Sequence, residues 1–130
     1  MAKNAKNYEE RPWGNFTVLA ELQNEGNTRD VIIKRLEVKP GKRLSYQQHN
    51  LRHEHWFVVA GSGHAVINDL RIPIKTGESV DIKINDKHRL DNTEGETPLI
   101  VIETIIGEFD EFDNTRLEDD FNRDSNWRNV

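Results

Sequence analysis

The sequence contains no cysteine. Disulfide bonds, thiolate metal sites and thiol catalysis are therefore excluded. Hydrophobic residues make up only 35% of the chain, close to the 32% of charged residues. Its longest apolar runs fall far short of the roughly 18 residues that a membrane-spanning helix needs. The first six residues lack the apolar segment of a secretory signal, so we expect a cytoplasmic protein with no membrane segment.

The charge balance argues against nucleic acid as a partner. The net charge is −5, and proteins that bind nucleic acid usually present a basic surface. The charge is unevenly distributed, because residues 34–52 carry mainly basic side chains and residues 108–124 mainly acidic ones. A basic patch on an acidic protein suits a small anion better than a polymer. The acidic run at residues 118–120 is expected to interact with basic residues of the same chain.

The turn pattern predicts an all-β fold. A length of 130 residues fits one domain, so we predict a single domain over residues 1–130. Turn residues recur every 8–12 residues or so between β-branched and aromatic runs, which is typical of a sandwich or barrel. Residues 117–121 read as a short helical turn. We place the barrel at about residues 15–107 and an acidic tail at residues 108–130. The predicted strands cover residues 16–20, 31–38, 44–48, 56–60, 64–67, 79–84 and 99–106.

Several polar side chains fall on the faces predicted to point inward. Side chains of a strand alternate between its two faces, so Lys34 shares a face with Ile32 and Leu36. By the same rule Gln47 shares a face with His49. Burying such groups without partners is costly. The interior of the barrel is therefore predicted to be partly polar and to hold ligands or partner groups.

A cluster of histidines suggests metal binding. His49, His53 and His55 fall within seven residues of one another, beside Glu54. Neutral imidazole and carboxylate together suit Zn, Fe, Mn, Co or Ni. Taken alone, the cluster is also compatible with an exposed polar turn, so its wider context has to decide.

The spacing of the anchors around this cluster follows two motifs. They read Gly41-x5-Gln47-x-His49-x4-Glu54-x6-Gly61 and Gly77-x5-Lys83-x-Asn85-x2-His88-x3-Asn92. In spacing the chain resembles the cupin superfamily, with Gln47, Lys83 and Asn85 standing where the superfamily usually has His, Pro and Gly. The resemblance implies a cupin double-stranded β-helix, a jelly-roll barrel. It also implies a divalent metal, zinc first and Co, Mn, Ni or Fe as alternatives. The implied metal ligands are Gln47, His49, Glu54 and His88.

Longer sequence motifs make the family resemblance more specific. They include Arg11-Pro12-Trp13-Gly14 at the N-terminal end, the run at residues 40–49, the run at residues 52–61, and His88-Arg89-Leu90-Asp91-Asn92. In these motifs the chain resembles the cupin domain of type II mannose-6-phosphate isomerases. In many such proteins this domain follows a mannose-1-phosphate guanylyltransferase domain in one polypeptide. The likeness extends from about residue 11 to residue 128. Gln is the expected residue at position 47 in this family.

This resemblance implies a metal-dependent aldose–ketose isomerase that converts mannose 6-phosphate to fructose 6-phosphate, within carbohydrate metabolism and polysaccharide biosynthesis. Lys34 is the first candidate for the base that moves the proton, or for a contact to the sugar. Glu103 is the second candidate for the base, and the alternative for it is an ion-paired strand residue. Arg43, Arg52 and Arg89 are candidates for binding the phosphate, because guanidinium groups bind phosphate through two hydrogen bonds.

Two other functions are compatible with the same barrel. One is a non-catalytic cupin that binds a sugar or a sugar nucleotide, and the other is a metal-dependent cupin oxygenase. Whether the chain is an enzyme is therefore open at this stage, with isomerase preferred. By analogy with the fold we expect a homodimer.

Overall fold

The computed structural model describes residues 7–23, 30–108 and 113–122 of the chain. All regular elements in these ranges are strands. Within the ranges no helix has the length and apolarity that crossing a bilayer requires. The strands are β1 (Tyr8–Arg11), β2 (Gly14–Gln23), β3 (Asp30–Val38), β4 (Tyr46–Gln48), β5 (Arg52–Ala60), β6 (Ser62–Ile67), β7 (Leu70–Lys75), β8 (Ser79–Ile82), β9 (His88–Asp91), β10 (Leu99–Gly107) and β11 (Thr115–Glu118).

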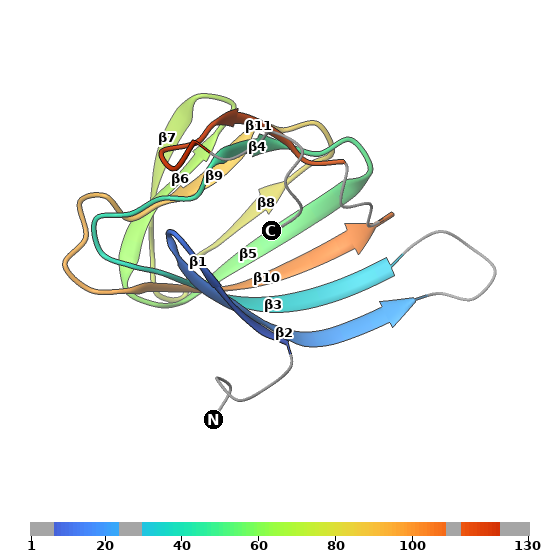
Figure 1. Cartoon of the computed structure of the whole chain (residues 1–130), viewed down its shortest axis with the longest axis horizontal. Coiled ribbons are helices and arrows are strands. Elements are labelled where there is room, and N and C mark those ends of the chain that lie inside the picture. Colours follow the sequence, from blue (N-terminus) through green and yellow to red (C-terminus); the bar gives the residue numbers. More distant parts are fainter. Residues whose placement is uncertain (1–6, 24–29, 109–112, 123–130) are drawn as a thin grey trace.

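The strands form two sheets that face each other (Figure 1). The first sheet has the order β1-β2-β3-β10-β5-β8 and the second the order β11-β4-β9-β6-β7. Strand β10 lies between β3 and β5, so strands distant in sequence are neighbours in space. Buried residues of both sheets, such as Leu36, Val58 and Leu90, form the hydrophobic core between them. This arrangement is the jelly roll predicted from the sequence.

Alternation on β3 follows the prediction. Ile32, Lys34, Leu36 and Val38 are buried, and the residues between them are half-buried. Lys34 therefore enters the interior alongside apolar neighbours, as a partly polar barrel requires. This places a charged side chain where only specific partners can hold it.

The strand prediction missed three edge strands and one internal strand. The sequence did not predict β1, β7 and β11, each of which lies at the edge of its sheet, nor β9, which lies between β4 and β6. Strand β7 contains Pro73 and is largely exposed, which is tolerated at an edge because an edge strand leaves some N–H groups unpaired. The helical turn predicted at residues 117–121 is wrong. Thr115–Glu118 instead pair with β4, whose backbone groups would otherwise form an open edge.

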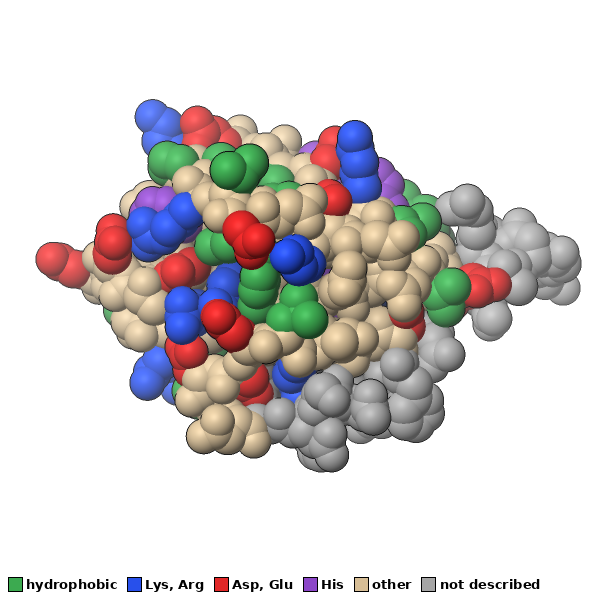
Figure 2. All heavy atoms as spheres, turned by 90° about the horizontal axis from the view of Figure 1, so that it is seen from above, with side chains coloured by type: hydrophobic (Ala, Val, Ile, Leu, Met, Phe, Trp, Pro, Cys, Tyr) green, Lys and Arg blue, Asp and Glu red, His purple; other side chains and the backbone are tan. Residues whose placement is uncertain are grey.

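Ion pairs attach the C-terminal acidic run to the second sheet. Arg43 makes two 2.8 Å hydrogen bonds to Asp120, and Arg89 donates to Glu118 at 2.9 Å. The prediction that the acidic run meets basic residues of its own chain is confirmed. On the face shown in Figure 2, basic side chains likewise lie among acidic ones.

Asn92, the last residue of the motif that begins at Gly77, has a structural role. Asn92 is fully buried, and its Nδ2 donates to the carbonyl oxygens of Val38 (3.0 Å) and Thr97 (2.9 Å). The side chain thus joins β9 to the end of β3 and to the loop that precedes β10. Its place in the motif is structural.

Replacing Asn92 by alanine is expected to lower the free energy of unfolding by about 2–4 kcal/mol, because the buried carbonyl of Val38 and the part-buried carbonyl of Thr97 lose their donor. Urea denaturation measures this loss. The exposed Asn50 provides a control, and its alanine variant should stay within about 0.5 kcal/mol of the parent. Equal stability of the two variants would contradict the role given to Asn92.

Candidate metal centre

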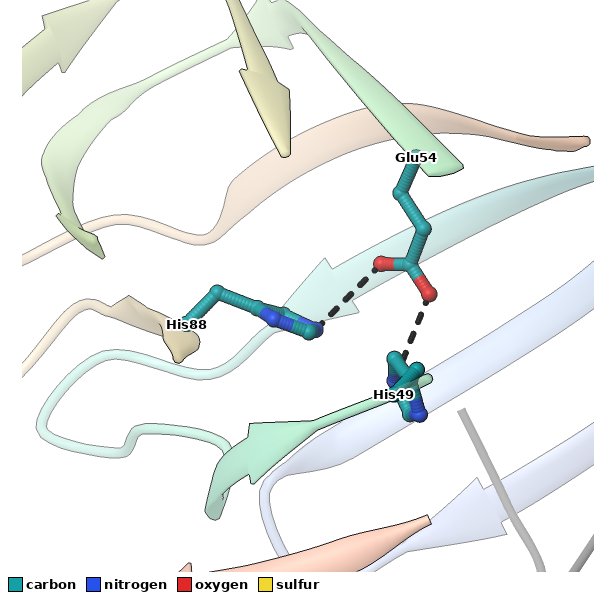
Figure 3. Close-up of side chains that lie close together, drawn as sticks. All are labelled: His49, Glu54 and His88. Atoms are coloured by element: carbon teal, nitrogen blue, oxygen red, sulfur yellow. Dashed lines mark ion pairs between the residues drawn. The ribbon is translucent and has the colours of Figure 1, made fainter. Parts of the chain in front are cut away.

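Three strands and one turn bring the predicted metal ligands together. Gln47 lies on β4, His49 directly follows β4, Glu54 lies on β5, and His88 begins β9. Gln47 and His88 are direct partners in the β4–β9 pairing, so their side chains share a face. Figure 3 shows both imidazoles directed at the carboxylate of Glu54. The His49 Nε2–Glu54 Oε2 distance is 3.4 Å and the His88 Nε2–Glu54 Oε1 distance is 3.5 Å.

Backbone carbonyls fix the orientation of both imidazoles. His49 Nδ1 lies 3.3 Å from the carbonyl oxygen of Asp113, and His88 Nδ1 lies 2.9 Å from that of Asp86. A carbonyl only accepts hydrogen bonds, so each Nδ1 carries the proton and each Nε2 presents a lone pair to Glu54. This is the arrangement that metal-ligating histidines adopt.

The electrostatics keep both rings neutral. Burial lowers the pKa of His88 to about 4. Burial, together with the positive charge of Arg52, lowers the pKa of His49 well below its usual value. Both imidazoles are therefore uncharged at neutral pH, which is the protonation state that binds a metal.

The donor set fits a divalent metal. The two Nε2 lone pairs face the two oxygens of a carboxylate that is only 2% exposed. Facing acceptors repel one another unless a cation or proton lies between them. Ligand atoms of His49, Glu54 and His88 all lie within 4.8 Å of one another. Gln47 Nε2 donates to Ser45 Oγ at 2.7 Å, so its carbonyl oxygen is the atom that would ligate a metal. Nitrogen and oxygen ligands of this kind suit zinc and the other metals predicted above.

A buried arginine lies against two of these ligands. Arg52 Nη2 donates to His49 Nε2 at 2.8 Å, and Arg52 Nε lies 3.1 Å from Glu54 Oε2. The other two arginines predicted to bind phosphate, Arg43 and Arg89, form the ion pairs with the acidic run. Arg89 follows His88 on β9, so its side chain leaves the opposite face of the strand. The structure therefore places Arg52 beside the predicted ligands, whereas Arg43 and Arg89 form ion pairs with the acidic run.

Both predicted base candidates lie in one row across the first sheet. Glu103 on β10 is the register partner of Lys34 on β3 and of Trp56 on β5. Trp56 Nε1 donates to Glu103 Oε2 at 3.0 Å. Burial and the negative charge of Glu54 raise the pKa of Glu103 to about 8. Burial lowers the pKa of Lys34. The raised pKa lets Glu103 exchange a proton near neutral pH, and the lowered pKa of Lys34 increases the share of its neutral amine.

The other histidines of the cluster lie outside the centre. His53 and His55 alternate with Glu54 on β5 and so leave its opposite face, where both are exposed or half-buried. His55 Nδ1 lies 2.8 Å from Asp81 Oδ1 on β8. The two carbonyls that orient His49 and His88 could not be predicted from the sequence, since every residue has a backbone carbonyl.

Comparison with known families finds one family model and several relatives that match most of the chain. Residues 2–119 match the family described as "Mannose-6-phosphate isomerase C-terminal". The alginate biosynthesis protein AlgA of Pseudomonas aeruginosa is 38% identical over 114 residues, which are 87% of this chain and 22% of AlgA. The mannose-1-phosphate guanylyltransferase ManC of Salmonella typhimurium is 39% identical over the same shares of both chains. The chain thus spans little more than a fifth of the length of these relatives.

Solved structures confirm the predicted cupin fold. The capsular polysaccharide assembling protein CapF of Staphylococcus aureus superposes with a TM-score of 0.69 at 24% identity, over 85% of this chain and 34% of CapF. A cupin-2 domain from Rhodospirillum rubrum superposes with a TM-score of 0.55 at 19% identity, over 72% of this chain and 58% of that one.

Proposed function

Because the chain belongs to the family of mannose-6-phosphate isomerase C-terminal domains, we propose that it is a metal-dependent aldose–ketose isomerase acting on mannose 6-phosphate and fructose 6-phosphate. One observation carries the proposal. Two buried, neutral imidazoles and one buried carboxylate direct their ligating atoms at a single point. The proposed ligands are these three and the amide oxygen of Gln47.

The reaction moves a proton between C1 and C2 of the sugar through an enediol. When bound, a divalent ion would polarise the carbonyl and stabilise the oxygens of the enediolate. A group of the chain has to take the proton from one carbon and return it to the other. Glu103 is suited to this because its raised pKa, about 8, lets it bind and release a proton near neutral pH. Lys34 is the alternative, since its lowered pKa increases the share of neutral amine.

Arg52 is the favoured contact for the phosphate group. Its guanidinium already lies at the ligands, whereas Arg43 and Arg89 would first have to leave Asp120 and Glu118. A guanidinium can bind phosphate through two parallel hydrogen bonds. Specificity for phosphorylated sugars over free sugars follows from this charge.

The test is to load the protein with Zn, Co, Mn, Ni or Fe and to follow mannose 6-phosphate by NMR. We expect fructose 6-phosphate to form, and we expect free mannose to be left unchanged under the same conditions. Failure to convert mannose 6-phosphate with any of the five metals would refute the proposed reaction for this substrate.

A second candidate is a module that binds a sugar phosphate or sugar nucleotide without turnover. The contact of Arg52 with His49 and Glu54 supports it, because a guanidinium can balance the charge of Glu54 without a metal. Saturable binding of mannose 6-phosphate by the metal-free protein, without conversion in any loaded form, would favour this function.

A further inference from the structure

The position of Arg52 bears directly on how the centre takes up a metal. The side chain is buried, with a residue exposure of 3%, and its guanidinium bridges the two ligands. The bridge consists of a hydrogen bond from Nη2 to His49 Nε2 (2.8 Å) and the close approach of Nε to Glu54 Oε2 (3.1 Å). A positive group thus occupies part of the space where ligand lone pairs converge.

The His49 imidazole cannot accept a hydrogen bond from Arg52 and bind a metal at the same time. A neutral imidazole has one protonated nitrogen and one nitrogen with a single lone pair. In His49 the protonated nitrogen, Nδ1, is directed at the Asp113 carbonyl. The lone pair of Nε2 can therefore accept from Arg52 or bind a metal, but it cannot do both.

We propose that Arg52 is a built-in competitor of the metal, and that metal binding requires its guanidinium to leave His49. The proposal rests on the metal site of the proposed function and adds a determinant of its affinity. Arg52 balances the buried charge of Glu54 in the metal-free protein. A metal that enters has to replace both this charge and the hydrogen bond to His49.

The sign of the effect separates competition from a merely structural role. If Arg52 only supported the ligands, its loss would loosen the centre and weaken metal binding. Under competition its loss removes one positive charge beside the buried Glu54 and frees the lone pair of His49, so metal binding becomes tighter. A charge-assisted hydrogen bond corresponds to roughly tenfold to a hundredfold in an equilibrium constant.

The experiment is a titration of metal-free protein with Zn²⁺ in competition with a chromophoric chelator. Arg52→Met keeps much of the side-chain volume and removes charge and donors, and we expect it to bind Zn²⁺ about tenfold to a hundredfold more tightly than the parent chain. Arg35→Met is the matched control. Arg35 is bonded to Glu37 at 3.2 Å, on the half-buried face of β3 opposite Lys34, so its loss removes one charge away from the centre. Its affinity should stay within about twofold of the parent.

Arg52→Gln also removes the charge and serves as a second variant if Arg52→Met does not fold. Equal or weaker Zn²⁺ binding in a folded Arg52 variant, with binding by the parent, would overturn the competition and leave the metal centre standing. Absence of binding by the parent chain and by both Arg52 variants would refute the metal centre of the proposed function as well. Zn²⁺ binding by the Arg52 variants but not by the parent chain would support the competition most strongly.

Discussion

Replacing His88 by alanine is expected to remove most of the metal, lowering affinity at least about a hundredfold. His88 is one of the two proposed imidazole ligands, and its Nε2 is one of the two nitrogens that face Glu54. Losing a residue that only orients a ligand already costs about tenfold to a hundredfold in affinity, so losing a ligand should cost more. The measurement is elemental analysis after dialysis against a limiting concentration of Zn²⁺.

His64 provides the matched control for this prediction. It lies on β6, half-buried, with Nε2 3.3 Å from Arg71 and no part in the ligand cluster. His64→Ala should retain the metal content of the parent chain. A metal content that His88→Ala leaves unchanged would disprove the assigned centre.

Replacing Glu103 by glutamine is expected to lower kcat by a factor of about 10² to 10⁴, the usual contribution of a positioned general base. The amide keeps the shape of the side chain and an acceptor for Trp56 Nε1. What it loses is the ability to bind and release a proton. Metal affinity should change by no more than a few fold.

Lys34→Met distinguishes the two base candidates, because it removes the other buried titratable group of the row. A variant that loses kcat while it keeps its metal and its KM identifies the base. If Glu103→Gln keeps the parent kcat and Lys34→Met loses it, the role passes to Lys34. If both keep it, neither residue is the base and the mechanism proposed for this centre is wrong.

The sequence predicted the strands whose burial alternates. On β3 and β5 buried residues alternate with more exposed ones, so a period of two was visible. On β9 all four residues are buried, so there is no alternation to find. The edge strand β7 pairs with β6 across the two-residue turn Asn68-Asp69, but five of its six residues are exposed, so it shows no alternation of burial. The edge strand β11 is held by pairing with β4, which is distant in sequence, and local sequence does not encode this pairing.

For the site, spacing predicted which residues meet but not how they are held. Alternation along β4 and its continuation put Gln47 and His49 on one side, and the two motifs marked Glu54 and His88. The contact of Arg52 with His49 depends on a side-chain conformation chosen by the surrounding packing, so Arg52 was predicted as a phosphate contact alone. The homodimer, the cytoplasmic location and the single domain stay predictions.

The most direct test of the isomerase assignment is proton exchange at the substrate. Metal-loaded protein is incubated with mannose 6-phosphate in ²H₂O, and deuterium at C1 and C2 is followed by NMR. Because the enediol exchanges its proton through a group of the chain, we predict deuterium in the sugar with the loaded parent protein and at least about a hundredfold less with His88→Ala. Sugar that stays free of deuterium with every one of the five metals would contradict the proposed function.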